Sequence, residues 1–160
     1  MSYLIIFVSF ASNLKLMFSK ACEYAIKATI YVAVQSLENK RVSLKDIARE
    51  IDSPVAFTAK ILQHLTKKNI MQSVMGPTGG FQIEKKKIDE IKLSQIVDAI
   101  DGDAIYRDCG LGLKECNAAK PCPVHDKFAK IRNDLKEMLE NTSLYELATG
   151  LEVGLTFLKR

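Results

Sequence analysis

Three of the four cysteines and one of the two histidines fall in a single stretch, residues 109–125, which reads CGLGLKECNAAKPCPVH. Thiolates and imidazole nitrogens are ligands for transition metals, so this cluster predicts a metal, iron–sulfur or redox site. Six residues separate Cys109 from Cys116, five separate Cys116 from Cys122, and two separate Cys122 from His125. These gaps are too long for the paired knuckles of a zinc ribbon. They suit a loop around a [2Fe–2S] or [4Fe–4S] cluster, which takes about four ligands. A metal-free thiol loop and a zinc site are the alternatives.

The composition of the chain favours a protein that works in a reducing compartment. The chain has 160 residues, of which 48% are hydrophobic and 26% charged, so it can bury a core without disulfide bonds. It shows no credible secretory signal, and we therefore expect a cytoplasmic protein with no membrane partner. Cys22 stands alone in an earlier predicted helix, and we expect it to be a buried or boundary thiol.

The elements that position this loop follow from apolar periodicity and capping residues. Helices are predicted over residues 19–37, from the Ser43 cap to residue 51, after Asp52-Ser53-Pro54, and from about Ser94 to Gly102. A β-hairpin is predicted around the turn sequence GPTGG at residues 76–80. A long helix follows the cysteines, from residue 123 to about 141, and a short one begins at 142 or 143. The predicted fold is mainly α with a small β-hairpin wing, which is a winged helix-turn-helix followed by a long C-terminal helix.

In a winged helix-turn-helix the second helix of the pair enters the major groove of DNA and the hairpin reaches an adjacent groove or the phosphates. Small residues at the start of that helix, Thr58 among them, would allow close approach, Phe57 could contact a thymine methyl, and the wing glycines would let the backbone lie near a phosphate. Many winged helices bind protein instead, which is the alternative. The residues expected to contact DNA are Ser53, Pro54, Ala56, Phe57, Lys60, Gln63, Thr78, Gly79 and Gly80.

Charge and motif content narrow the class of function further. The net charge is +4, and the basic excess lies in residues 17–90, which suits a polyanion partner. Solvated lysines, such as Lys85–Lys87 at the end of a strand, explain the charge equally well. We find no nucleophile–base pairing, phosphate-binding glycine loop or metalloprotease motif, so we predict no enzyme and no catalytic residues.

Residues 1–16 differ in character from the rest. They are largely apolar but too short to span a bilayer, and we interpret them as a non-native or mis-assigned extension before a functional start at Met17. A short partner-binding strand or helix is the alternative. We therefore divide the chain into residues 1–16, a DNA-binding winged helix-turn-helix over 17–90, and the cysteine loop with dimerisation helices over 91–160.

From Met17 to about residue 150 the chain resembles the winged-helix iron–sulfur regulators typified by IscR and NsrR, the Rrf-two family. The matching segments are SKACEYAIKA, VSLKDIAREIDSP, LTKKNI, GPTGGF, LSQIVDAIDG and the cysteine loop ending PCPVH. The resemblance implies a homodimer held by the long helix, a palindromic operator, and a cluster whose presence or loss controls DNA affinity. It implies Cys109, Cys116 and Cys122 as cluster ligands, with His125 as the fourth ligand or Glu23 supplied by the partner subunit.

Three features of the chain differ from the family pattern. The first cysteine gap has six residues where compared members have five, Met75 stands where IscR has arginine, and Ala59 stands where IscR has glutamate. We therefore expect a different operator sequence. The chain is predicted to be a DNA-binding transcription regulator, expected to be a repressor, whose operator affinity depends on a cluster or on thiol state. The alternative is a protein-interaction module with a zinc or metal-free thiol loop.

Overall fold

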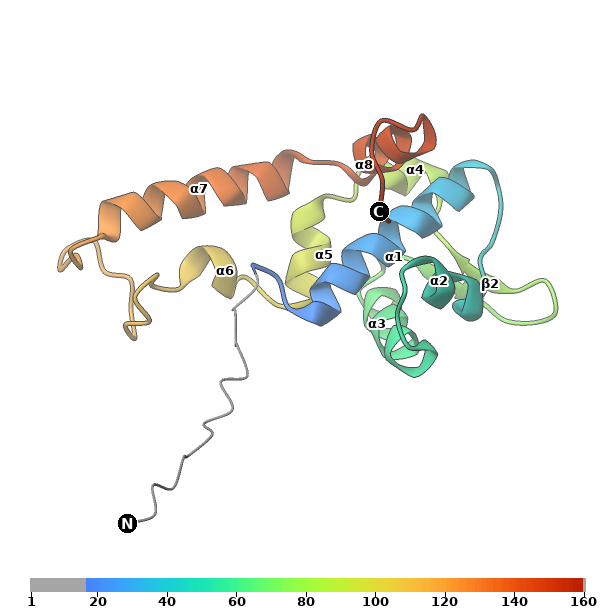
Figure 1. The fold of residues 1–160 in the computed structure, drawn as a ribbon, viewed down its shortest axis with the longest axis horizontal. Coiled ribbons are helices and arrows are strands. Elements are labelled where there is room, and N and C mark those ends of the chain that lie inside the picture. Colours follow the sequence, from blue (N-terminus) through green and yellow to red (C-terminus); the bar gives the residue numbers. More distant parts are fainter. Residues whose placement is uncertain (1–16, 160) are drawn as a thin grey trace, which may run out of the picture.

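The computed structural model describes residues 17–159 (Figure 1). The interpretation of residues 1–16 as an extension falls outside the described residues. The first three helices are found as predicted: α1 (Lys20–Leu37) is followed by the helix-turn-helix pair α2 (Leu44–Glu50) and α3 (Val55–Lys67). Ser19 and Ser43 cap α1 and α2 as expected, each accepting a hydrogen bond from a backbone N–H in the first turn. Asp52, with a φ of 52°, provides the left-handed residue that turns the chain between α2 and α3.

The wing is a two-stranded antiparallel hairpin of β1 (Gln72–Val74) and β2 (Gly80–Gln82), as predicted. A third segment joins it, because Val42 in the α1–α2 turn exchanges two backbone hydrogen bonds with Phe81, at 3.0 and 2.8 Å. The amide of Ile83 donates to the buried hydroxyl of Ser36 at 3.0 Å instead of extending the sheet, which ends the strand.

The prediction that Lys85–Lys87 lie at a strand end is wrong. Strand β2 ends at Gln82, and the lysines belong to a four-residue helix, α4 (Lys85–Ile88). Lys86 and Lys87 pair with Glu84 at 3.2 and 3.8 Å, and Ile88 is fully buried. The apolar residue therefore anchors the turn while the lysines remain on the surface.

The second half of the chain contains α5 (Leu93–Ile100), α6 (Ala104–Arg107), α7 (His125–Asn141) and α8 (Leu144–Glu152). Helix α7 is the predicted long helix, beginning two residues later than expected. Helix α8 packs on α1, and α7 runs past α5 and α6 along one edge (Figure 1). The cysteine loop and the wing lie at opposite ends of the long axis (Figure 1).

A continuous hydrophobic core ties both halves together. It joins Leu62 and Leu65 of α3 to Ile96 of α5, Leu139 of α7 and Leu144 of α8, all fully buried. The apolar residues of α7 differ in burial: Leu139 is in the core, whereas Ile131 and Met138 have 60% and 45% of their surface exposed. Among the described residues, none of the helices combines the length and apolar character that crossing a bilayer would take.

Candidate functional site

The cysteine loop connects α6 to α7, and its four candidate ligands are half-buried and fall into two pairs. In one pair, Sγ of Cys116 lies 3.4 Å from Nδ1 of His125, the first residue of α7. In the other, the Cys122 thiol is near enough to Cys109 to lower the pKa of that thiol. All four cysteines of the chain are free of disulfide bonds. The loop therefore presents three thiols and an imidazole, but it does not gather them at one point.

The loop backbone stabilises a thiolate at Cys109. The N–H groups of Leu111 and Leu113 donate to this sulfur and lower the pKa of Cys109, and the Cys122 thiol and the Arg132 guanidinium lower it further. Metal ligation and oxidation both proceed through the thiolate, so this environment favours either chemistry.

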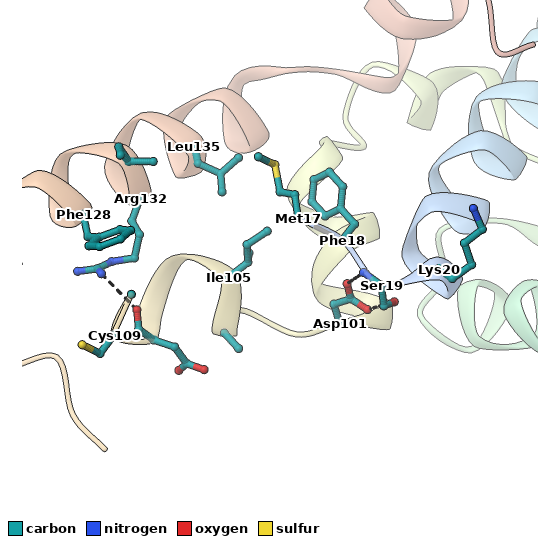
Figure 2. Close-up of a pocket in the computed structure, with 14 residues that line it drawn as sticks. Met17, Phe18, Ser19, Lys20, Asp101, Ile105, Cys109, Phe128, Arg132 and Leu135 are labelled. Atoms are coloured by element: carbon teal, nitrogen blue, oxygen red, sulfur yellow. Dashed lines mark hydrogen bonds between the residues drawn. The ribbon is translucent and has the colours of Figure 1, made fainter. Parts of the chain in front are cut away.

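Arg132 is the residue of the site that sequence reasoning missed. Its Nη2 donates to Sγ of Cys116 at 3.0 Å. Its Nη1 donates to the carbonyl of Asp108 at 3.2 Å (Figure 2). The signal was present in the spacing, because residues seven apart return to nearly the same face of a helix, and His125 and Arg132 are seven apart on α7. The guanidinium therefore ties the middle of the loop and its beginning to the long helix.

The donor set fits an iron–sulfur cluster in type, although the two pairs are separate. Three thiols and an imidazole are suitable ligands, and backbone N–H groups that point at a sulfur are among the features that tune such clusters. Within residues 17–159, no three His, Cys, Asp or Glu side chains lie close enough together to hold a single metal ion. Among these residues, the donors would have to move closer together to hold either a zinc ion or a cluster.

Beside the loop, an apolar groove of about 650 Å³ separates α7 from α6 and the start of α1 (Figure 2). Phe128, Ile131 and Leu135 line it from α7, and Cys109 lies in its wall. The loop packs directly on this helix, since a Cβ on Gly110 would lie 2.6 Å from the Phe128 ring. A glycine is needed at position 110 for this approach.

At the other end of the groove, Asp101 links the end of α5 to the start of α1. Its carboxylate accepts hydrogen bonds from the backbone N–H of Ser19, at 2.8 Å, and from the Ser19 hydroxyl (Figure 2). Burial, together with the Asp101 carboxylate, raises the pKa of the Cys22 thiol to about 12. Cys22 is fully buried, as expected. Glu23 does not line the groove and pairs with Lys20 at 2.8 Å.

Most of the candidate DNA-contacting residues just before α3 and along it are accessible. Pro54, Ala56, Phe57, Lys60 and Gln63 are exposed. The Ser53 hydroxyl is buried and finds no hydrogen-bond partner among residues 17–159.

Thr58 and Phe57 differ in how they contribute to this surface. The expectation that Thr58 allows close approach to DNA is wrong, because it is fully buried and donates to the Pro54 carbonyl at 3.1 Å. Phe57 packs edge-on against Tyr24 of α1, with ring centroids 5.9 Å apart, so this aromatic side chain is held in place by the first helix.

The wing glycines have a structural role that the sequence did not reveal. A Cβ on Gly79 would lie 2.2 Å from the Val74 carbonyl oxygen, and one on Gly80 would lie 2.7 Å from the Val42 carbonyl oxygen. Gly80 also has a φ of 138°, which L side chains rarely adopt. The two glycines are therefore required to close the hairpin, whatever contact their backbone makes with DNA. Thr78, beside them, is exposed.

Comparisons with known proteins identify the family to which the chain belongs. Residues 18–150 match the Rrf2 family, described as an iron-dependent transcriptional regulator. A protein of Aquifex aeolicus named as an HTH-type transcriptional regulator is 31% identical over 135 residues, which cover 82% of this chain and 91% of that protein. The regulator IscR of Pectobacterium atrosepticum is 28% identical over 130 residues, covering 81% and 77% of the two chains.

Two solved structures share the fold. CymR, the global cysteine regulator of B. subtilis, superposes with a TM-score of 0.68 at 22% identity, covering 84% of this chain and 97% of that one. IscR of T. potens gives the same TM-score and identity and covers 89% and 93%. The fold and the family match together show that this chain belongs to the Rrf2 family of DNA-binding transcriptional regulators.

Proposed function

We propose that this regulator is a cytoplasmic homodimeric repressor whose affinity for a palindromic operator is set by an iron–sulfur cluster in the cysteine loop. Residues 17–90 would read DNA, and residues 91–160 would sense the signal and dimerise. The observation that carries the proposal is the loop itself: three thiols and an imidazole, one thiol with a lowered pKa, immediately before the long helix.

Cys109, Cys116 and Cys122 are the proposed cluster ligands, with His125 as the fourth. When bound, the cluster supplies a group that oxygen, nitric oxide or iron supply can alter. His125 is favoured because it already lies 3.4 Å from Cys116 in the same loop. Glu23 is the alternative, supplied by the partner subunit's first helix. Either choice requires the two donor pairs to come together, and the bonds from Arg132 to Cys116 and Asp108 would then be rearranged.

The contacts around the groove provide a route from the loop to the DNA-reading helix. The loop follows α6, which follows Asp101, and Asp101 holds the start of α1 through Ser19. Helix α1 in turn supports Phe57 of α3 through Tyr24. A change in the loop could therefore alter the placement of α3, and the matching of two half-sites makes operator affinity sensitive to such placement. A coupling of about 1–3 kcal/mol is typical of regulatory switches.

The exposed residues of α7 support dimerisation through this helix. Ile131 and Met138 lie two helical turns apart and remain exposed, while Leu135 between them lines the apolar groove. Covering such a surface with the same surface of a second copy is how two-fold dimers usually form.

Anaerobic reconstitution with iron and sulfide, followed by visible absorption and by iron and sulfide assays, tests the cluster. We expect a coloured protein, loss of the colour in Cys116→Ala, and its retention in Cys22→Ala, the matched control outside the loop. Zinc without sulfide would favour the protein-interaction alternative. A colourless, metal-free wild type would refute the cluster. The separate donor pairs already make a metal-free thiol switch the second candidate.

A further inference from the structure

The wing carries no charged side chain of its own at its tip. Residues 75–80 read MGPTGG, and Met75 is 90% exposed. Affinity for DNA comes largely from cationic groups that neutralise phosphates. A wing that contacts the DNA backbone therefore needs a positive charge from another part of the chain.

Arg41, in the turn between α1 and α2, lies against the wing. Its Nε donates to Oε1 of Gln82 in β2 at 2.8 Å, and its Nη1 donates to the carbonyl of Thr78 at 3.2 Å. The adjacent residue, Val42, exchanges two backbone hydrogen bonds with Phe81. The backbone beside Arg41 and its guanidinium are therefore both fixed to the hairpin.

The guanidinium retains both its charge and most of its donors. Arginine has five N–H donors, of which two are used here, so three remain within the described part of the chain. Both acceptors are neutral, and no carboxylate of residues 17–159 forms an ion pair with Arg41. The side chain is exposed. The neighbouring Lys40, by contrast, pairs with Glu38.

We propose that Arg41 binds a DNA phosphate beside the wing and supplies the charge that the wing tip lacks. The two bonds to the hairpin hold the guanidinium in place before DNA arrives, so little side-chain freedom is lost on binding. A planar group with free N–H donors matches phosphate oxygens, and arginine is well suited to this contact. The inference rests on DNA binding by this chain and not on the cluster.

The test uses a duplex that the wild-type protein enriches from a random pool, with affinity measured by fluorescence anisotropy over a series of KCl concentrations. The variants are Arg41→Gln, Arg41→Lys and the matched control Lys40→Gln, whose charge is already paired. Gln82→Ala removes the acceptor for Nε while leaving the charge. Circular dichroism confirms that each variant is folded.

We expect Arg41→Gln to weaken binding about tenfold and to reduce the slope of log affinity against log salt by about 0.9 for each bound subunit. Arg41→Lys should restore the slope, Gln82→Ala should weaken binding with the slope unchanged, and Lys40→Gln should change neither. An unchanged slope in Arg41→Gln would overturn the proposal, as would an equal loss in Lys40→Gln. Failure of the wild type to enrich any duplex would instead overturn DNA binding, and this inference with it.

Discussion

Replacing Gly80 by alanine would place a methyl group against the backbone of the α1–α2 turn, 2.7 Å from the Val42 carbonyl oxygen and 3.1 Å from its carbon. That oxygen accepts the Phe81 amide at 2.8 Å, so the turn cannot move away without losing this bond and its reciprocal one. Losing both costs about 1–3 kcal/mol. The positive φ of 138° costs alanine about 1–3 kcal/mol more. The total destabilisation is therefore about 2–6 kcal/mol.

Gly76→Ala is the matched control. Gly76 also has a positive φ, of 104°, but an added Cβ would meet no atom within 4 Å. Gly76→Ala therefore has only the conformational cost of a positive φ. The difference in unfolding free energy between the two variants, about 1–3 kcal/mol, is the contribution of the two hydrogen bonds that join the turn to the wing.

Hydrogen exchange of the Phe81 amide is the direct assay, supported by urea unfolding followed by circular dichroism. We expect fast exchange at Phe81 in Gly80→Ala and near-normal exchange in Gly76→Ala. DNA affinity should fall more in the first variant, because Arg41 loses its fixed position on the wing. Equal protection of Phe81 in both variants would refute the close approach as the reason for the glycine.

Leu139→Ala should lower the free energy of unfolding by about 2–5 kcal/mol, because Leu139 is fully buried. Ile131 is 60% exposed, so Ile131→Ala should change this free energy by less than about 0.5 kcal/mol. The same variant should weaken the dimer, as measured by sedimentation. The reverse order would contradict the assignment of the two faces of α7. In metal-free protein at neutral pH, iodoacetamide should label Cys109 before Cys22. The lowered pKa of Cys109 increases the fraction of this thiol that is ionised and reactive, whereas the pKa of Cys22 is raised to about 12. Equal labelling by mass spectrometry would count against this difference. Arg132→Gln should speed hydrogen exchange in the cysteine loop, and unchanged exchange would show that the guanidinium does not hold the loop.

Local chemistry explains which elements the sequence could predict. Ser19 and Ser43 mark helix starts through bonds made within three residues, and the structure confirms both. The end of β2 depends instead on Ser36, which captures the Ile83 amide across 47 positions of the chain. No local pattern encodes such a contact, so the helix at Lys85–Ile88 was missed.

The same limit applies to the site. The types and spacing of the donors predicted the loop, but its pairing of Cys116 with His125 depends on how α7 lies against the loop. The role of Arg132 follows from that packing. Burial likewise removed Thr58 from the predicted DNA surface, because the helix turns this side chain toward the core.

The most direct test of cluster control is the affinity for the enriched duplex, measured anaerobically for one preparation before and after reconstitution with iron and sulfide. We predict a change of about 5- to 150-fold, which corresponds to a coupling of about 1–3 kcal/mol. The change should disappear in Cys116→Ala and persist in Cys22→Ala. Identical affinities for the metal-free and reconstituted wild type, with the cluster verified by its sulfide content, would contradict the central claim.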